Sequence, residues 1–378
     1  MQPRQPVTVD GQVHFERAVF QCGKCRRSFA PLDAELRLAP REKFLRSVVR
    51  KIAHAGATNS FGGAVRAMEE QAELAVSKAE VARVVKREGK RLDEAQHARQ
   101  AAYNAPVDPG RAQSVAEPAE LVAKRLVMEA DATCVLTVKG EEHKSVYCAT
   151  AFALESRGKK GNRPFIAERL YAASAVSFEE FSTCAKALAW RAGMREALEM
   201  AFLGDGATSL WKWAKENLPK GTVLIQDFWH VCEHLVALGK ALFGEEHYQA
   251  RFKRWKRTLR AGQVESLIRT LARERARHGA AGRAAIDAEL TYLRAGRDRM
   301  DYARYEAEGW PIGSGAIEGT CKHLVKERFC VTGAHWRRAN LPEVLALRLS
   351  IFNGEWQADW TDSPDRPVPA KPCEEEAA

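Results

Sequence analysis

The sequence lacks long apolar stretches. No unbroken apolar run in its 378 residues approaches the roughly 18 that a membrane-spanning helix needs, which excludes an integral membrane protein. The first thirty residues are interrupted by charges and have no apolar segment typical of a secretory signal, so we expect a cytoplasmic protein. Internal repeats are absent too, and only the Pro- and Glu-rich stretch 361–378 is predicted to be disordered.

Clustered cysteines are also scarce. Most of the nine cysteines occur singly in apolar segments, which indicates reduced, buried residues rather than a disulfide framework. Cys22 and Cys25 differ, because they form a CxxC pair of the kind found in half of a zinc ribbon. A structural zinc ion needs four ligands, and no second pair follows. Residues 1–38 therefore predict either an incomplete zinc site or two reduced surface thiols.

The positive charge is concentrated in one part of the chain. Lys and Arg exceed Asp and Glu by ten, and residues 251–300 alone carry fourteen Lys and Arg against five Asp and Glu. Apolar residues recur there at helical spacing, so we predict a basic helical insertion over 241–308. A solvated helix surface explains the charge as well as contact with DNA phosphates does. The candidates for phosphate contact are Arg254, Lys256 and Arg257.

Residues 39–100 have the pattern of several helices separated by short breaks. Ser77 and Glu80 form a capping box at the start of the last helix, which is rich in Lys and Arg. A basic second helix after a tight turn is typical of a helix-turn-helix DNA-binding region, although many helical hairpins are also basic. Pro and Gly then indicate a linker over 101–120.

From residue 121 the pattern changes to short strands. Three runs rich in Val, Tyr and Ala between 125 and 174 predict strands, 177–192 predicts a capped helix, and 196–206 and 221–231 predict two more strands. The sequence therefore predicts an α/β fold, with a first part over 121–240 and a final part over 309–360. The basic helical insertion follows the fifth strand.

Three carboxylates occupy positions where chemistry is expected. Asp131 lies in the first predicted strand, Asp205 lies between two glycines after the fourth, and Glu318 follows a Gly-Ser-Gly helix start. Carboxylates at strand ends can converge, and a converged set needs a cation to offset its repulsion. Oxygen ligands favour Mg²⁺ or Mn²⁺, and a pair of such ions supports phosphoryl transfer. Taken singly, Asp131 or Asp205 is as well explained as a turn or cap residue.

A second polar group lies in the segment DFWHVCEHL. Asp227, His230 and His234 occur at helical spacing, as in a zinc-binding helix. The order is not HExxH, which argues against a zinc hydrolase. We expect these residues to position the neighbouring site.

Taken together, the motifs resemble those of bacterial insertion-sequence transposases of the ISKra group, DDE transposases related to Mutator-like elements. The resemblance depends on ADAT, FLGDGATSLW, LIQDFWHVCEHL and PIGSGAIEGTCKHLVKERF, followed by GAHWRRANLPEVLALRLSIFNGEW, in that order. It implies a ribonuclease-H-like core with a helical insertion, and a catalytic triad at Asp131, Asp205 and Glu318. The family's auxiliary motif is matched by Asp227 and His230.

The same resemblance implies the partners and cofactors. It implies two Mg²⁺ or Mn²⁺ ions at the triad and a Zn²⁺ ion at an N-terminal ribbon, of which Cys22 and Cys25 match the later half. It also implies transposon-end and target DNA as partners, a homodimer or higher oligomer on DNA, and association with the bacterial nucleoid. Trp336 is either a DNA contact or a core residue. The expected DNA-phosphate contacts near and beyond the Glu318 helix are Lys322, Lys326, Arg328, His335, Trp336, Arg337 and Arg338.

The chain departs from the family's motifs in two places, and two alternative functions remain. The chain lacks the first Cys pair of a full ribbon, so we expect a truncated start or no zinc, and Ala132 replaces a Gly that many related transposases have. One alternative is a non-catalytic DNA-binding protein derived from a transposase. The other is a ribonuclease-H-like nuclease without strand transfer.

Overall fold

The computed structural model describes residues 1–36, 38, 42–104, 119–121, 123–155 and 164–361. The chain forms two compact units. Unit 1 comprises Met1–Ala98, Leu136–His143 and Lys326–Ala378, and unit 2 comprises Arg99–Val135 and Lys144–Val325. Residues 362–378 of the predicted disordered tail and most of the predicted linker lie outside the described residues, whereas Thr361 ends a helix. Among those that are described, no helix combines the length and the apolar character needed to cross a bilayer.

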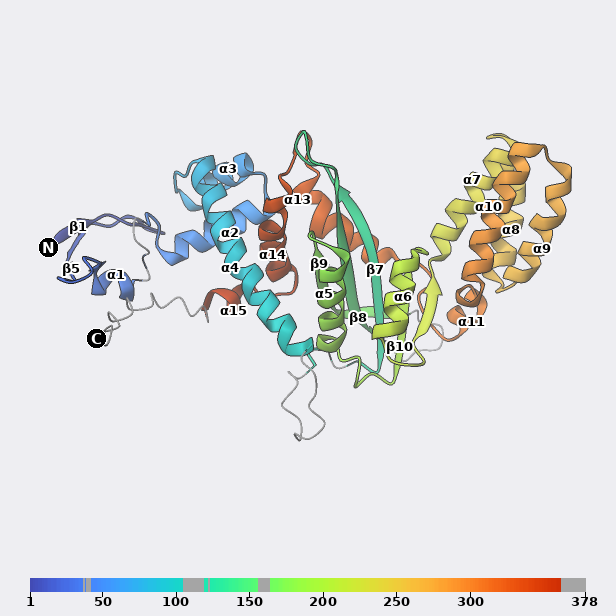
Figure 1. The fold of residues 1–378 in the computed structure, drawn as a ribbon, viewed down its shortest axis with the longest axis horizontal. Coiled ribbons are helices and arrows are strands. Elements are labelled where there is room, and N and C mark those ends of the chain that lie inside the picture. The colour runs from blue at the N-terminus through green and yellow to red at the C-terminus, as the bar shows by residue number, and fades with distance from the viewer. Residues whose placement is uncertain (37, 39–41, 105–118, 122, 156–163, 362–378) are drawn as a thin grey trace. The chain divides into compact units, whose positions relative to one another are not determined.

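Unit 2 is built on a mixed five-stranded sheet (Figure 1). Its strands are β7 (Arg125–Val135), β8 (Lys144–Glu155), β9 (Phe165–Ser174), β10 (Glu199–Gly204) and β11 (Val223–Gln226), in the spatial order β11-β10-β7-β8-β9. β8 runs antiparallel to β7 and β9, whereas β10 and β11 run parallel to β7. The α/β prediction is confirmed to this extent, and each of the five predicted strands occurs.

Helices cover both faces of this sheet. Leu126 and Met128 of β7 point to the face covered by α5 (Phe178–Arg191) and α6 (Thr208–Asn217), and Val127 points to the face covered by α7 (Phe228–Phe243). This alternation follows from the two-residue period of a strand. Because both faces are buried, the strands are nearly continuous apolar runs, and a charged residue within one needs a specific partner.

The predicted insertion is helical. It contains α8 (Tyr248–Arg260), α9 (Val264–Glu274), α10 (Ala280–Gly296) and α11 (Tyr302–Ala307), which gather beyond the edge strand β11 (Figure 1). Their apolar residues, including Trp255, Leu267 and Leu290, form one core cluster with α7. The expected continuation of the fifth strand through 228–231 is wrong. The strand ends at Gln226, because the next residue caps the N-terminus of α7.

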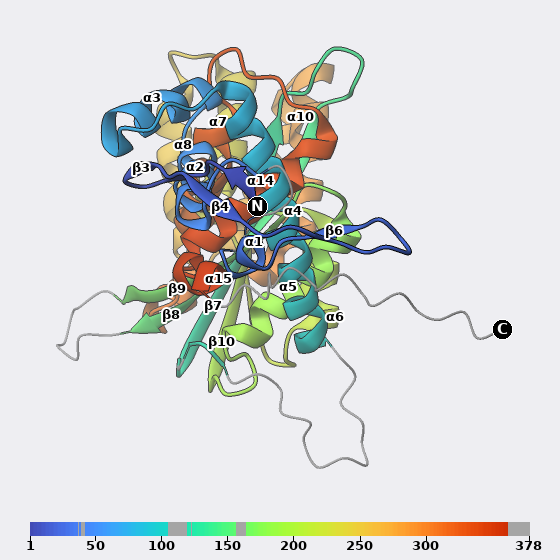
Figure 2. The same cartoon turned by 90° about the vertical axis from the view of Figure 1, so that its left-hand side faces the viewer.

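Unit 1 contains α2 (Arg46–Thr58), α3 (Phe61–Ala72) and most of α4 (Lys78–Asn104), together with α14 (Leu341–Phe352) and α15 (Trp356–Thr361). The capping box is confirmed, since the Ser77 amide donates to Glu80 Oε2 at 2.8 Å and the Glu80 amide donates to Ser77 Oγ at 3.2 Å. α4 continues four residues past the predicted helical region. α14 packs beside α2 and α4 (Figure 2), so the predicted final part of the core is divided between the two units at residue 326.

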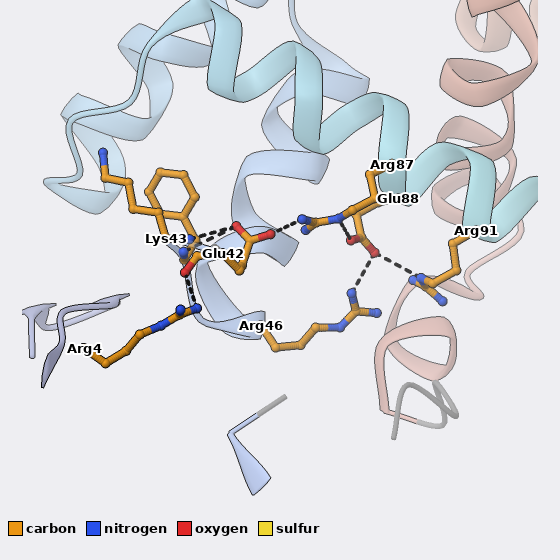
Figure 3. A network of polar contacts seen from close by, with 8 residues as sticks. Arg4, Glu42, Lys43, Arg46, Arg87, Glu88 and Arg91 are labelled. Atoms are coloured by element: carbon orange, nitrogen blue, oxygen red, sulfur yellow. Dashed lines mark hydrogen bonds and ion pairs between the residues drawn. The ribbon is translucent and has the colours of Figure 1, made fainter. Parts of the chain in front are cut away.

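A buried carboxylate joins the helices of unit 1 (Figure 3). Glu88 of α4 is 3% exposed and accepts hydrogen bonds from Arg46 (2.6 Å), Arg87 (2.9 Å) and Arg91 (3.0 Å). Burial opposes the ionisation of Glu88, but the arginine charges outweigh it and lower its pKa. Arg87 also pairs with Glu42. Its charge is therefore engaged within unit 1. Arg83, Lys86 and Lys90 are exposed on the same helix.

The N-terminal segment consists of three two-stranded hairpin pairings and a short helix. β1 (Gln2–Arg4) pairs with β4 (Phe15–Arg17), β2 (Val7–Thr8) with β3 (Gly11–Gln12), and β5 (Phe20–Gln21) with β6 (Ser28–Phe29), before α1 (Pro31–Glu35). Cys22 and Cys25 lie exposed in the turn between β5 and β6, where the Cys22 amide donates to Arg27 O at 2.9 Å. The zinc site stays a prediction.

Candidate active site

Asp131 lies inside β7, opposite Cys148 of β8. It is four residues from Val127 and so shares the sheet face that α7 covers. Its Oδ1 accepts a hydrogen bond of 2.6 Å from the Ala132 amide. Burial raises the pKa of Asp131, the amide opposes this, and the negative charges of Asp205 and Glu318 raise the pKa further. The three predicted carboxylates are therefore close enough for their charges to interact.

Asp205 follows the last residue of β10, in a turn that requires glycine. Its Oδ1 accepts a hydrogen bond of 3.1 Å from the Ala207 amide. Gly206 has φ +120°, which other residues rarely adopt, and a Cβ atom there would lie 3.2 Å from both Gln226 Nε2 and Tyr292 Cε2. Tyr292 belongs to α10, so the insertion packs directly on the turn that carries Asp205.

Asp227 is 1% exposed, and donors of the protein surround its carboxylate. Oδ1 accepts from the amides of Trp229 and His230, which caps α7, and Oδ2 accepts from the amide of Ser314 at 2.7 Å and from its hydroxyl. Asp227 thus joins the start of α7 to the segment that leads to Glu318. Bonds of this kind suit a positioning residue, and the auxiliary role of Asp227 stays a prediction.

Glu318 is exposed on α12 (Gly315–Thr320). The chain continues from α12 through a π-helical turn (Cys321–Lys326) into α13 (Glu327–Phe329). Cys321 forms a hydrogen bond with Cys148 of β8, and this bond together with burial raises the pKa of the Cys148 thiol. π-Helical turns are frequent at functional sites. Here the turn follows the helix that presents the third carboxylate.

The sequence interpretation missed Glu129. This residue of β7 is 1% exposed, and its Oε2 accepts a hydrogen bond of 2.7 Å from the Ile317 amide in the first turn of α12. Burial raises the pKa of Glu129 to about 8, against the effect of that amide, and the charges of Asp227 and Glu318 raise it too. A signal did exist, because Glu129 interrupts an apolar strand two residues before Asp131 and therefore lies on the same face.

Two histidines of α7 connect the carboxylates with α10. His230 lies beside Asp131, where its positive charge would lower the pKa of Asp131. The His234 ring stacks on Tyr292, with centroids 4.1 Å apart and planes 10° apart. Its Nδ1 lies 3.4 Å from Glu289 Oε2, and this hydrogen bond raises the pKa of His234. The insertion therefore supplies one wall of the candidate site.

All but one of the predicted DNA contacts of unit 2 are exposed, and Lys256 is the exception. Arg254 and Arg257 are exposed on α8, and Lys322 is exposed on the π-helical turn. Lys256 is half-buried, and its ammonium lies 4.2 Å from the ring centroid of Trp229. This lysine is thus held beside an aromatic ring as well as available to an anion.

In unit 1 the structure corrects two of the predicted DNA contacts. Arg328 is 3% exposed; its Nε donates to Gly56 O at 3.0 Å, and its guanidinium lies 4.8 Å from the Trp336 ring. Burial and the charge of Arg348 lower the pKa of Arg328 to about 10. Trp336 is also buried and donates to Phe329 O at 3.0 Å. Both residues belong to the interior, which is the alternative left open for Trp336. Arg328 is bonded to α2, and Trp336 is bonded to the main chain of α13.

The other predicted contacts of unit 1 reach its surface. Lys326, His335 and Arg337 are exposed, whereas the Arg338 guanidinium is half-buried and donates to Glu142 O at 2.7 and 3.0 Å. A cavity of about 790 Å³ lies beside His335 and Arg337. Its lining includes residues of α4 and of the 331–337 segment, among them Arg83, Lys86, His335 and Arg337. The exposed basic residues of α4 and of this segment thus border one hollow.

The donor chemistry of the carboxylates suits a hard divalent ion. Asp131, Asp205 and Glu318 offer oxygen ligands, which Mg²⁺ and Mn²⁺ prefer, and a cation would offset the repulsion that raises the pKa of Asp131. Within the part of the chain that the structure describes, no three His, Cys, Asp or Glu side chains already converge at ligand distances. Scans of family models and of curated proteins each found no match.

Proposed function

We propose that the chain is a DDE transposase of a bacterial insertion sequence, which binds transposon ends and catalyses metal-dependent DNA cleavage and strand transfer. The observation that carries the proposal is the placement of three carboxylates that are far apart in sequence. Asp131 lies on β7, Asp205 follows the neighbouring parallel strand β10, and Glu318 lies on α12, whose first turn is bonded to β7 through Glu129. The pKa of half-buried Asp131 is raised, and carboxylates with perturbed pKa values concentrate at functional sites.

The sheet topology supports a ribonuclease-H-like core. In chain order the strands are arranged 3-2-1-4-5, and the second alone runs against the others. A ribonuclease-H-like core has this arrangement, with acidic residues on the first strand and after the fourth. Asp131 and Asp205 occupy those positions here, on β7 and after β10.

Asp131, Asp205 and Glu318 would hold the divalent ions. Bound Mg²⁺ supplies charge neutralisation for the attacking and leaving oxygens of a phosphodiester. The protein's own part is positioning: Asp227 fixes Ser314, and Glu129 fixes the first turn of α12, so that Glu318 is presented at a constant place. The Gly206 turn does the same for Asp205.

DNA binding is proposed for the exposed basic residues. Arg83, Lys86 and Lys90 lie on α4, which follows a short turn as the second helix of a helix-turn-helix does. Arg254 and Arg257 lie on the insertion that also packs on the Asp205 turn. We propose that the protein acts on DNA as a homodimer or higher oligomer.

The test uses purified full-length protein and DNA that carries the sequences flanking its gene. With Mg²⁺, wild type should nick these ends and join them to target DNA, and Asp131→Asn should do neither while still binding the ends. Asp298→Asn, which changes an exposed aspartate of the insertion, is the matched control. Nicking without joining would favour the nuclease alternative, and binding without nicking by wild type would favour the non-catalytic one.

A further inference from the structure

Trp229 is an exposed aromatic residue at the edge of the candidate active site. It is the second residue of α7, lies between Asp227 and His230, and is 51% exposed. A tryptophan of the core would be buried, since its large apolar surface gains most from leaving water. A half-exposed indole beside the candidate active site is therefore a candidate contact for a bound ligand.

Several contacts fix the position of Trp229. The main-chain amide of Trp229 donates to Asp227 Oδ1, and the indole ring meets the Phe228 ring edge-on at a centroid distance of 5.3 Å. The main chain at Gly313 lies so close that a Cβ there would be 2.7 Å from Trp229 Cδ1. The Lys256 ammonium lies 4.2 Å from the ring centroid. Rigid placement removes the entropy cost of ordering the ring when a partner binds.

A pocket of about 370 Å³ adjoins this ring. Its lining is largely apolar and includes Trp229, Phe228, Trp310, Pro311 and Ile312, with Arg260 at its edge. The charge of Arg260 is balanced by Glu306, to which it donates two hydrogen bonds of 2.7 and 3.1 Å. The volume is at the small end for ligand pockets and suits one flat ring system rather than a base pair.

We propose that Trp229 and this pocket take an unpaired base of the DNA substrate, stacked on the indole, with a neighbouring phosphate near Lys256. Bases within a duplex stack on one another, so only an unpaired base can offer its face to the ring. Gly313 precedes Ser314, which Asp227 binds, so a base held here lies beside the segment that carries Glu318. The inference rests on the proposed function, because it assumes a DNA substrate.

The experiment compares two probes. One is a mixed-sequence hairpin duplex with a blunt end, and the other is the same duplex with a short oligothymidine overhang. Binding to full-length protein is measured by fluorescence anisotropy without divalent ions. Wild type should prefer the overhang, and Trp229→Ala should weaken overhang binding about ten-fold, as expected for the loss of one stacked base. Binding to the blunt duplex should not change.

Two further variants control for structure. Trp229→Phe keeps an aromatic face and should retain most of the preference. Trp190→Ala removes another tryptophan with a cation over its ring and should change neither probe. Trp190 lies on α5, and the Arg195 guanidinium is 3.6 Å from its ring centroid. Equal binding of the overhang by wild type and Trp229→Ala would overturn the inference and leave the proposed function standing. An equal loss on both probes would also overturn it. If wild type binds neither probe, the proposed function itself fails.

Discussion

The hydroxyl of Tyr292 donates a hydrogen bond of 3.3 Å to the main-chain carbonyl oxygen of Asp205. This bond joins α10 of the insertion to the turn that carries the second carboxylate. The stack of Tyr292 on His234, and the contact of His234 with buried Glu289, hold the phenol ring in place. The insertion therefore has a structural part in the candidate active site, in addition to any contact with DNA.

Replacing Tyr292 with Phe should weaken the site without unfolding it. The change removes the hydrogen bond to Asp205 and keeps the ring stack, so a loss of about 1 kcal/mol in the placement of Asp205 is expected. That corresponds to roughly five-fold weaker Mn²⁺ binding, measured by titration of the apoprotein. Tyr248→Phe, on α8, is the control. Unchanged Mn²⁺ affinity in Tyr292→Phe would show that the bond does not position Asp205.

Replacing Asp227 with Asn should destabilise unit 2. The buried carboxylate accepts four hydrogen bonds, from Trp229, His230 and twice from Ser314, and an amide can accept fewer. We expect a loss of about 2 to 3 kcal/mol in the free energy of unfolding, measured by urea denaturation. A loss within about 0.5 kcal/mol, the range of ordinary surface changes, would contradict the positioning role.

Because of Glu129, the free energy of unfolding should decrease as the pH rises. Its pKa is about 8 in the folded state and near 4.5 when exposed, so between these values the folded state holds a proton that the unfolded state releases. The folded state therefore loses stability from about pH 5 to pH 8, and Glu129→Gln should remove that loss. Urea unfolding at both pH values, without divalent ions, is the measurement. Equal pH dependence of variant and wild type would show that Glu129 is already ionised.

Neutralising Arg254 and Arg257 should flatten the salt dependence of DNA binding. If each contacts one phosphate, changing both to Gln lowers the slope of log affinity against log salt by roughly 2 on B-DNA. Lys212 and Lys215 of α6, on the opposite face of the sheet, supply the matched control when both become Gln. An unaltered slope would mean that the charge of α8 belongs to a solvated surface.

The sequence was sufficient for features that depend on local pattern. The strands, the capping box at Ser77, the N-cap at Ser177 and the helices of the insertion follow from periodicity and caps. It failed at 228–231, where the apolar run suggested a longer strand and the capping of α7 by Asp227 decided otherwise. Capping outweighed composition there.

Features that depend on packing between distant segments were not predictable. The role of Glu129 requires knowing that α12 packs on β7, and the burial of Arg328 requires knowing that its guanidinium reaches the end of α2. Basic residues after the Glu318 helix were therefore treated alike, although Arg328 is interior and Lys326 is exposed. The exposure of Trp229 could not be predicted either, because a residue type does not determine exposure.

We expect Asp131, Asp205 and Glu318 to act as one catalytic group on DNA. The measurement is a Mg²⁺-dependent cleavage and joining assay on the flanking DNA ends, with Asp131→Asn, Asp205→Asn and Glu318→Gln assayed in parallel. Each substitution alone should reduce both products to background while the ends are still bound. Cleavage at the wild-type rate by any one of the three variants would show that the three carboxylates do not act as one group.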